Sequence, residues 1–145
     1  IMDGSPCYDA LILSRSRHPE FSGSVEGETA TAQGNNPVCG DRVMLSLRAT
    51  DGTVSAVRHQ TRGCAICMAS ADLMAEAVTG RSVTEALELG RRFADMLETP
   101  SAQDMSADED VLPVGLQAFR PLRTHRSRLR WATLPWTALG EALTQ

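Results

Sequence analysis

The sequence predicts an α+β fold in which several α-helices pack on one face of a small antiparallel β-sheet. Two patterns support this prediction. Residues 42–60 alternate apolar and polar side chains around the pair Asp51-Gly52, which is typical of a β-hairpin. After Gly63 the apolar residues recur every three or four positions, which is the period of a helix. Because strands come first and helices follow, an antiparallel sheet covered by helices is favoured over alternating β and α units.

The chain before the hairpin contributes one helix and one edge strand. Residues 6–17 carry apolar side chains at helical spacing. This segment ends at His18-Pro19, because the residue before a proline is displaced from the helical region. Residues 21–36 are rich in Gly, Ser and Thr. We expect a loop there, with at most an irregular edge strand beside the hairpin.

Two helices follow the hairpin. The first extends from about Ile66 to Gly80, where the helical apolar pattern ends. The second opens at Ser82, because Glu85 three residues later completes a capping box. Its apolar pattern continues to Pro100.

The last third of the chain contains a polar stretch and a final helix. Residues 98–116 are rich in Asp and Glu, and we expect an exposed acidic linker or insertion there. Residues 126–143 have the pattern of a helix that is interrupted near Pro135. With 145 residues and no internal repeat, the chain is expected to form a single domain over 1–145.

The composition excludes several classes of protein. With 14 Arg, no Lys and 18 acidic residues, the formal net charge is −4, which argues against a general nucleic-acid-binding protein. No apolar run approaches the roughly 18 residues of a membrane helix, and we see no secretion signal. We therefore expect a cytoplasmic protein whose four cysteines are free thiols in a reducing compartment.

Three cysteines and one carboxylate stand at the two ends of the predicted hairpin. Cys39 and Asp41 lie where the chain enters it, and Cys64 and Cys67 lie where the chain leaves it and the next helix starts. A hairpin brings its two ends together, and zinc accepts both thiolate and carboxylate ligands, so a metal site is one interpretation. A helix start is also expected to lower the pKa of the Cys64 thiol. The alternative is that two cysteines three residues apart are small core residues.

Other candidate groups are less informative. We interpret Cys7 as a core or incidental residue and His18 as a turn residue, whereas His59 on the second strand can face either side of the sheet. A series of arginines is most simply a solvated face, or else a docking patch for a protein partner. It comprises Arg120, Arg123, Arg126, Arg128 and Arg130.

Three segments follow one another in a recognisable order: NPVCGDR at 36–42, GCAICMASA at 63–71 and WATLPWTAL at 131–139. They resemble the motifs NPxCGD(R), Gly-Cys-x-Ile-x-x-Ala-Ser and Cys-Ala-Thr-Leu-x-Trp-x-Ala-Leu of the NifU, IscU and SufU family of iron–sulfur assembly proteins. The acidic stretch stands where SufU proteins have an insertion. Arg130 stands where IscU proteins have a histidine. The resemblance is therefore to SufU, and it implies a SufE/NifU-like fold.

The resemblance implies that three cysteines and one aspartate form a site for zinc or a transient iron–sulfur cluster. Cys39, Asp41 and Cys64 match that pattern, but Trp131 stands at the position of the third cysteine, and an indole neither ligates zinc nor accepts sulfur. Cys67 can supply the missing thiolate, provided that the helix begins at or after it. The alternatives are a site with three protein ligands and an open position, or a site that has lost its activity.

By the same resemblance, Cys39 and Cys64 would accept persulfide sulfur from a cysteine desulfurase of the SufS type, or hold a nascent cluster for iron–sulfur acceptor or carrier proteins. The protein would then be at most a sulfurtransferase-type acceptor. We expect neither nucleic acid nor membrane as a partner. The alternative is a non-catalytic module in which zinc joins two loops and the arginine series docks a partner. A thioredoxin-like redox protein is disfavoured, because the βαβ pattern of that fold is missing.

Overall fold

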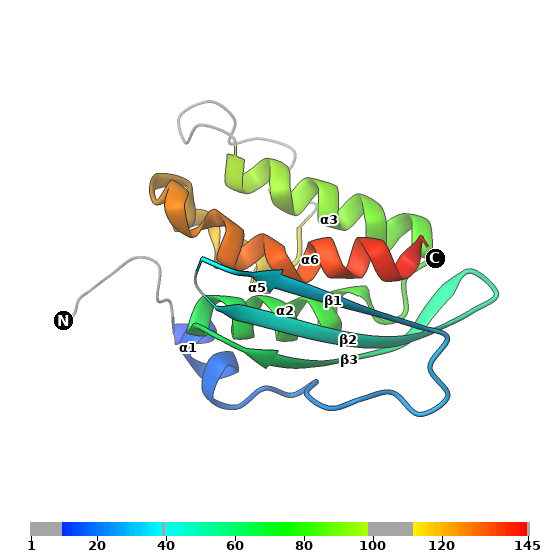
Figure 1. Cartoon of the computed structure of the whole chain (residues 1–145). Coiled ribbons are helices and arrows are strands. Elements are labelled where there is room, and N and C mark those ends of the chain that lie inside the picture. The colour runs from blue at the N-terminus through cyan, green and yellow to red at the C-terminus, as the bar shows by residue number, and fades with distance from the viewer. Residues whose placement is uncertain (1–9, 39, 99–111, 145) are drawn as a thin grey trace.

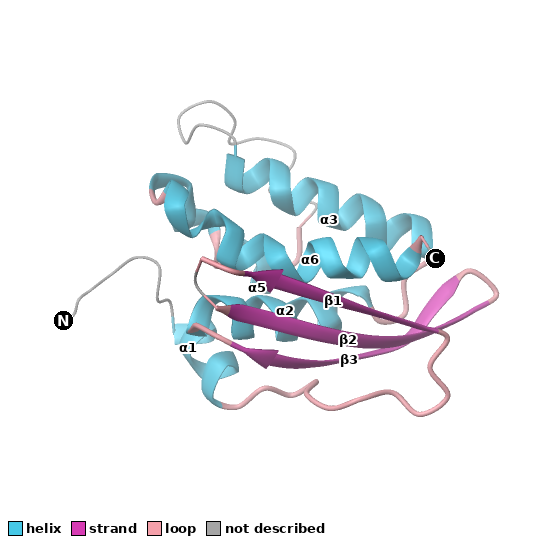
Figure 2. Ribbon diagram, viewed as in Figure 1, coloured by secondary structure: helices cyan, strands magenta, loops and turns pink. Residues whose placement is uncertain are grey.

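The computed structural model describes residues 10–38, 40–98 and 112–144. Its sheet has three antiparallel strands in the order β1-β2-β3: β1 (Ala30–Asn36), β2 (Asp41–Thr50) and β3 (Thr53–Arg62). The helices gather on one face of the sheet and leave the opposite face without a helix (Figures 1 and 2). They are α1 (Ala10–Arg17), α2 (Ala65–Val78), α3 (Val83–Glu98), α5 (Val114–Gln117), the 3₁₀ helices η1 (Arg120–Thr124) and η2 (Arg126–Arg128), and α6 (Leu129–Leu143). The predicted α+β fold is confirmed.

The hairpin forms where the alternating pattern predicts it. Asp51 and Gly52 join β2 to β3 with φ angles of +54° and +77°, the conformation that a two-residue hairpin turn requires. The edge strand is more regular than expected, since β1 pairs with β2 without a break from Ala30 opposite Leu47 to Asn36 opposite Asp41. Pairing with β2 and packing against α6 therefore outweigh the weak strand propensity of these residues.

The core lies between the sheet and α2 and α6. The inward residues of β2, among them Val43, Leu45 and Leu47, are buried. Because α2 lies between the sheet and other helices, most of its residues are buried. An aromatic cluster joins α3 to the C-terminal part of the chain: the ring of Phe93 lies edge-on to Phe119 and stacked on Trp136.

The boundaries after the hairpin agree in part with the sequence. The capping box of α3 is present, because the Glu85 amide donates to Ser82 Oγ and the Ser82 amide donates to Glu85 Oε1. The last α-helix begins at Leu129 rather than at 126 and retains Pro135 inside it. Part of the predicted acidic linker, 99–111, lies outside the described residues. Its ends are structured, with Glu98 in α3 and Leu112 buried in the core.

No helix in the described part of the chain combines the length and the apolar composition of a membrane span.

A buried carboxylate, Asp72 of α2, fastens the α1–β1 connection to the helices and to β3. Its two oxygens accept hydrogen bonds from Arg15 Nη1 (2.8 Å), His59 Nε2 (2.9 Å) and the backbone amides of Glu20 (2.9 Å) and Phe21 (2.7 Å). Burial alone raises the pKa of Asp72, but these hydrogen bonds outweigh burial and lower the pKa to about 2. Asp72 is therefore ionised, and the hydrogen bonds to both of its oxygens stabilise the buried charge.

Replacing Asp72 with Asn is expected to reduce the free energy of unfolding by about 3–5 kcal/mol, because it removes the buried negative charge opposite Arg15 and puts an NH2 donor in place of one acceptor oxygen. Urea denaturation measures this difference. Asp95→Asn is the control, since Asp95 is exposed and pairs with Arg91 at the surface; we expect it to reduce stability by less than about 1 kcal/mol.

The same contribution has a defined pH dependence. A carboxylate whose folded pKa is depressed stabilises the fold above its unfolded pKa, 3.8, and loses that contribution as the pH falls towards about 2. The stability difference between the wild type and Asp72→Asn should therefore shrink between pH 4 and pH 2. A difference that stays constant over this range would show that Asp72 is not held as a carboxylate.

Candidate metal centre at the end of the sheet

Asp41 and Cys64 meet at the end of the sheet where the hairpin begins and ends. Asp41 is the first residue of β2, and Cys64 is the N-cap of α2 directly after β3. The Cys64 amide donates to Asp41 Oδ1 at 3.2 Å, and Cys64 Sγ lies 3.8 Å from Asp41 Oδ2. The predicted meeting of the two ends of the hairpin is confirmed for these two residues.

Gly63 makes this approach possible. Its φ is +151°, and a Cβ at this position would lie 2.2 Å from Asp41 Oδ1. No side chain can occupy that space while the carboxylate stays in place. The turn between β3 and α2 is therefore shaped around Asp41.

The two donor atoms fit a shared zinc ion. Tetrahedral zinc with Zn–S of about 2.3 Å and Zn–O of about 2.0 Å places its sulfur and oxygen ligands about 3.5 Å apart, close to the 3.8 Å between Cys64 Sγ and Asp41 Oδ2. Cys39 and Cys7 lie outside the described residues. Among those that are described, no three His, Cys, Asp or Glu side chains are grouped to hold a metal ion. The structure therefore provides two fitting ligands among its described residues, Asp41 and Cys64.

Cys67 lies in the first turn of α2 and belongs to the core. Its side chain is fully buried, and its amide donates to Cys64 Sγ at 3.4 Å. Burial strongly raises the pKa of the Cys67 thiol, and the nearby Asp41 carboxylate and Cys64 raise it further. Since α2 begins at Ala65, the helix starts before Cys67, so the condition for joint ligation by Cys64 and Cys67 is not met in this conformation.

The pKa of the Cys64 thiol is raised, contrary to the expectation from its place at a helix start. Burial has the largest effect and raises the pKa, and the Asp41 carboxylate adds to it. The amides of Cys67 and Ile66 act in the expected direction and lower the pKa, but they do not outweigh burial. A bound cation would shift the balance towards the thiolate.

The remaining candidates are placed as follows. Trp131 is half-buried in the first turn of α6, with the guanidinium of Arg128 5.6 Å above its ring. His59 faces the core, where it contacts Asp72 and Thr61, and so does not reach the centre. His18 is exposed after α1. The sequence did not point to the Asp72 network, because its partners are distant along the chain.

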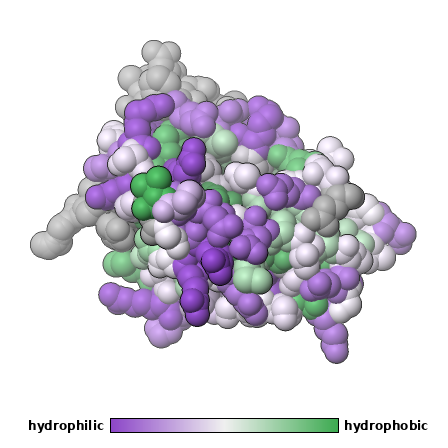
Figure 3. All heavy atoms as spheres, in the orientation of Figure 1, coloured by the Kyte–Doolittle hydropathy of each residue, from purple (hydrophilic) through white to green (hydrophobic). Residues whose placement is uncertain are grey.

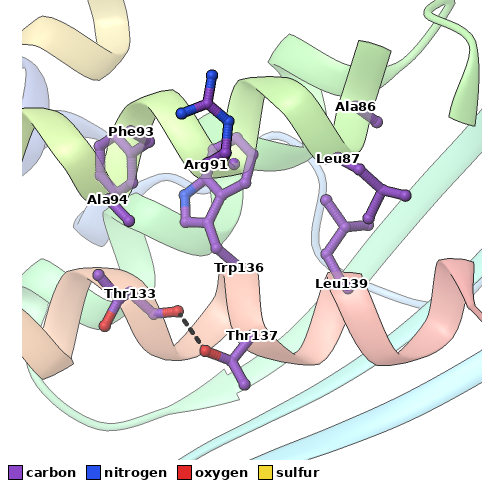
Figure 4. A pocket seen from close by; sticks show the side chains of 11 residues that line it. Ala86, Leu87, Arg91, Phe93, Ala94, Thr133, Trp136, Thr137 and Leu139 are labelled. Atoms are coloured by element: carbon purple, nitrogen blue, oxygen red, sulfur yellow. Dashed lines mark hydrogen bonds between the residues drawn. The ribbon is translucent and has the colours of Figure 1, made fainter. Parts of the chain in front are cut away.

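A separate hollow lies between α3 and α6. Figure 4 shows Phe93, Trp136 and Leu139 on its wall. Its volume is about 210 Å³, below the roughly 300 Å³ at which small-molecule sites begin, and most of its lining is apolar. Its described lining contains no carboxylate, histidine or thiol, so it is a weaker candidate site than the pair Asp41 and Cys64.

Comparisons with known proteins identify the family and several relatives of the chain. Residues 7–124 match the family described as the NifU-like N terminal domain. The chain is 28% identical to the zinc-dependent sulfurtransferase SufU of Bacillus subtilis (strain 168), with 95% of this chain and 90% of that protein covered. It is 32% identical to the iron–sulfur cluster assembly scaffold protein IscU of Streptococcus pyogenes serotype M1, with 94% and 82% covered.

One solved structure is similar over nearly the whole chain. It is FiSufU of the thermophile Fervidobacterium islandicum AW-1, assigned as an iron–sulfur cluster assembly scaffold for the SUF system. The TM-score is 0.85 at 28% identity, with 97% of this chain and 99% of that chain covered.

Gly63→Ala is expected to displace Asp41 and to reduce the free energy of unfolding by about 1–3 kcal/mol, because the added Cβ overlaps the carboxylate. Gly140→Ala is the matched control: a Cβ there meets no atom within 4 Å, and alanine is the better helix former. Urea denaturation of both variants measures the effect. Equal stability of Gly63→Ala and the wild type would contradict the close approach of Asp41.

Proposed function

The chain belongs to the NifU-like N-terminal domain family, and from this premise we propose that it is an iron–sulfur cluster assembly protein of the SufU kind that accepts sulfur from a cysteine desulfurase. The observation that carries the proposal is the meeting of Asp41 and Cys64 at a separation suited to one zinc ion. The similarity to a zinc-dependent SufU over 95% of this chain supports the same centre.

The proposed ligands are Cys39, Asp41 and Cys64, with Cys67 as a fourth if the first turn of α2 opens. Bound zinc would keep the cysteines as thiolates and shelter them until a partner arrives. Asp41 is the labile member of the set, because a carboxylate is a harder ligand than a thiolate and is more readily released. The hydrogen bond from the Cys64 amide would hold the Asp41 carboxylate near the centre whether or not it ligates zinc.

The proposed reaction is sulfur transfer between two cysteines. The thiolate of Cys39 or Cys64 attacks the terminal sulfur of the persulfide on the desulfurase. A new S–S bond forms on this protein, the S–S bond of the donor breaks, and the electron pair returns to the desulfurase cysteine as its thiolate. The proton stays on the transferred sulfur. Because one S–S bond replaces another, no external oxidant or reductant is consumed. A desulfurase of the SufS type is the proposed partner, and iron–sulfur acceptor or carrier proteins are the proposed recipients.

Trp131 limits which residues take part. Because an indole accepts no sulfur, the proposed acceptor is Cys39 or Cys64. We therefore propose slower transfer than in a chain with cysteine at this position.

The metal content of protein purified without added metal tests the centre. We expect about one zinc per chain and no acid-labile sulfide, with zinc lost in Asp41→Ala and Cys64→Ser. Cys7→Ser is the control, because Cys7 is not a proposed ligand. Loss of zinc in Cys67→Ser would establish Cys67 as the fourth ligand. Iron together with sulfide would favour the scaffold role, and a folded wild type without metal would contradict the centre.

Cysteine desulfurase activity with this protein as acceptor tests the function. We expect a SufS-type enzyme to turn over several-fold faster when the protein is added, with persulfide found by mass spectrometry on Cys39 or Cys64. The matching Cys→Ser variant should abolish the stimulation, and Trp131→Cys should increase it. An unstimulated desulfurase, together with variants that lose zinc and stability, would indicate instead a module in which zinc serves structure alone.

A further inference from the structure

The face of the sheet that carries no helix is basic. The three strands contain a single carboxylate, Asp41, which is buried, and four arginines: Arg42, Arg48, Arg58 and Arg62. These arginines alternate with the inward residues of β2 and β3, so they stand on the outer side. We call them the basic face. Figure 3 shows this side of the molecule, with hydrophilic side chains gathered over the strands.

The basic face lacks counterions. Within residues 10–38, 40–98 and 112–144, none of its four arginines forms an ion pair with a carboxylate. Arg42 and Arg62 are directly opposite each other on β2 and β3, an arrangement in which like charges destabilise a sheet. A protein with a net charge of −4 thus concentrates unpaired positive charge on one side.

Neutral groups hold several of these side chains in place. Arg42 Nε donates to Asn35 Oδ1 at 3.3 Å, and Arg48 Nη1 donates to the Glu26 carbonyl at 2.8 Å. The guanidinium of Arg58 lies 5.2 Å above the ring of Phe21. These contacts orient the guanidinium groups without neutralising them, which lowers the entropy lost when an anionic group binds.

The basic face is also hollowed. Two depressions of about 400 and 540 Å³ share Met44 and Gln60 in their linings, and the larger one includes Arg42 and Arg62. Met44 is 45% exposed. Arginine and methionine are enriched at protein–protein interfaces. The one carboxylate in these linings, Glu28, belongs to the smaller depression.

We propose that the basic face docks an acidic surface of a partner protein, whose carboxylates meet Arg42 and Arg62. Charge complementarity identifies the partner as acidic, and the mixture of Arg, Met and Gln favours a protein surface. A polyphosphate chain such as a nucleic acid fits less well. Proteins that bind one usually carry an excess of positive charge, whereas here four arginines stand on an otherwise acidic molecule. Arg42 follows Asp41, and Arg62 precedes Cys64 by two residues, so the partner would be seated beside the centre. The docking does not depend on metal or on sulfur transfer.

A fluorescein-labelled decaglutamate peptide serves as the probe, with binding followed by fluorescence anisotropy in low salt. We expect the double variant Arg42→Gln/Arg62→Gln to bind the peptide roughly two- to thirtyfold more weakly than the wild type, which is the sum expected for two exposed charge pairs. The wild type should lose affinity as salt is added. The thermal midpoint of the double variant should equal or exceed that of the wild type, because two opposed like charges are removed.

The matched control is Arg91→Gln/Arg92→Gln, which removes two arginines of α3 that pair with Glu88 and Asp95. It should bind the peptide as the wild type does. Equal weakening in both double variants, weakening by Arg126→Gln/Arg130→Gln instead, or no binding by the wild type would overturn the proposal. Tighter binding of a ten-residue thymidine oligonucleotide than of the peptide would also overturn it, in favour of a nucleic acid.

Discussion

The buried carboxylate of Asp72 is the interaction on which the arrangement of the remaining elements depends. A charge removed from water must be matched by donors, and Asp72 receives them from α1, from the connection after α1 and from β3. Because these segments are far apart in sequence, a single side chain fixes where α1 and α2 lie relative to the sheet. The position of α2 in turn sets where Cys64 stands relative to the first residue of β2.

The candidate centre, like the Asp72 network, joins side chains from different elements of the fold. A thiol and a carboxylate arrive from different elements, and a glycine turn lets them approach. Burial opposes the thiolate of Cys64. The contribution of the fold that the structure shows is therefore the position of the two groups beside each other.

Local patterns in the sequence predicted the elements that local chemistry determines. Asp51-Gly52 dictates the hairpin turn, Ser82 and Glu85 dictate the start of α3, and hairpin geometry brings Asp41 to Cys64. Features that depend on distant partners were not predictable. The regularity of β1 comes from its neighbours rather than from its residues, and the Asp72 network joins positions more than fifty residues apart. The start of α2 at Ala65, which encloses Cys67, also follows from packing, because spacing alone does not show which side of a helix is covered.

The edge strand β1 also bears on how the molecule avoids self-association. In the described part of the chain β1 has a strand on one side only, so its other side is a sheet edge of the kind that can recruit foreign strands. Its sequence, ATAQGNN, lacks the large aliphatic and aromatic side chains that promote pairing between sheet edges. The residues that made β1 hard to recognise as a strand are thus the residues that make it safe to expose. The weak strand propensity of β1 thus disfavours pairing with foreign strands. Pairing with β2 and packing against α6 hold β1 in its extended conformation.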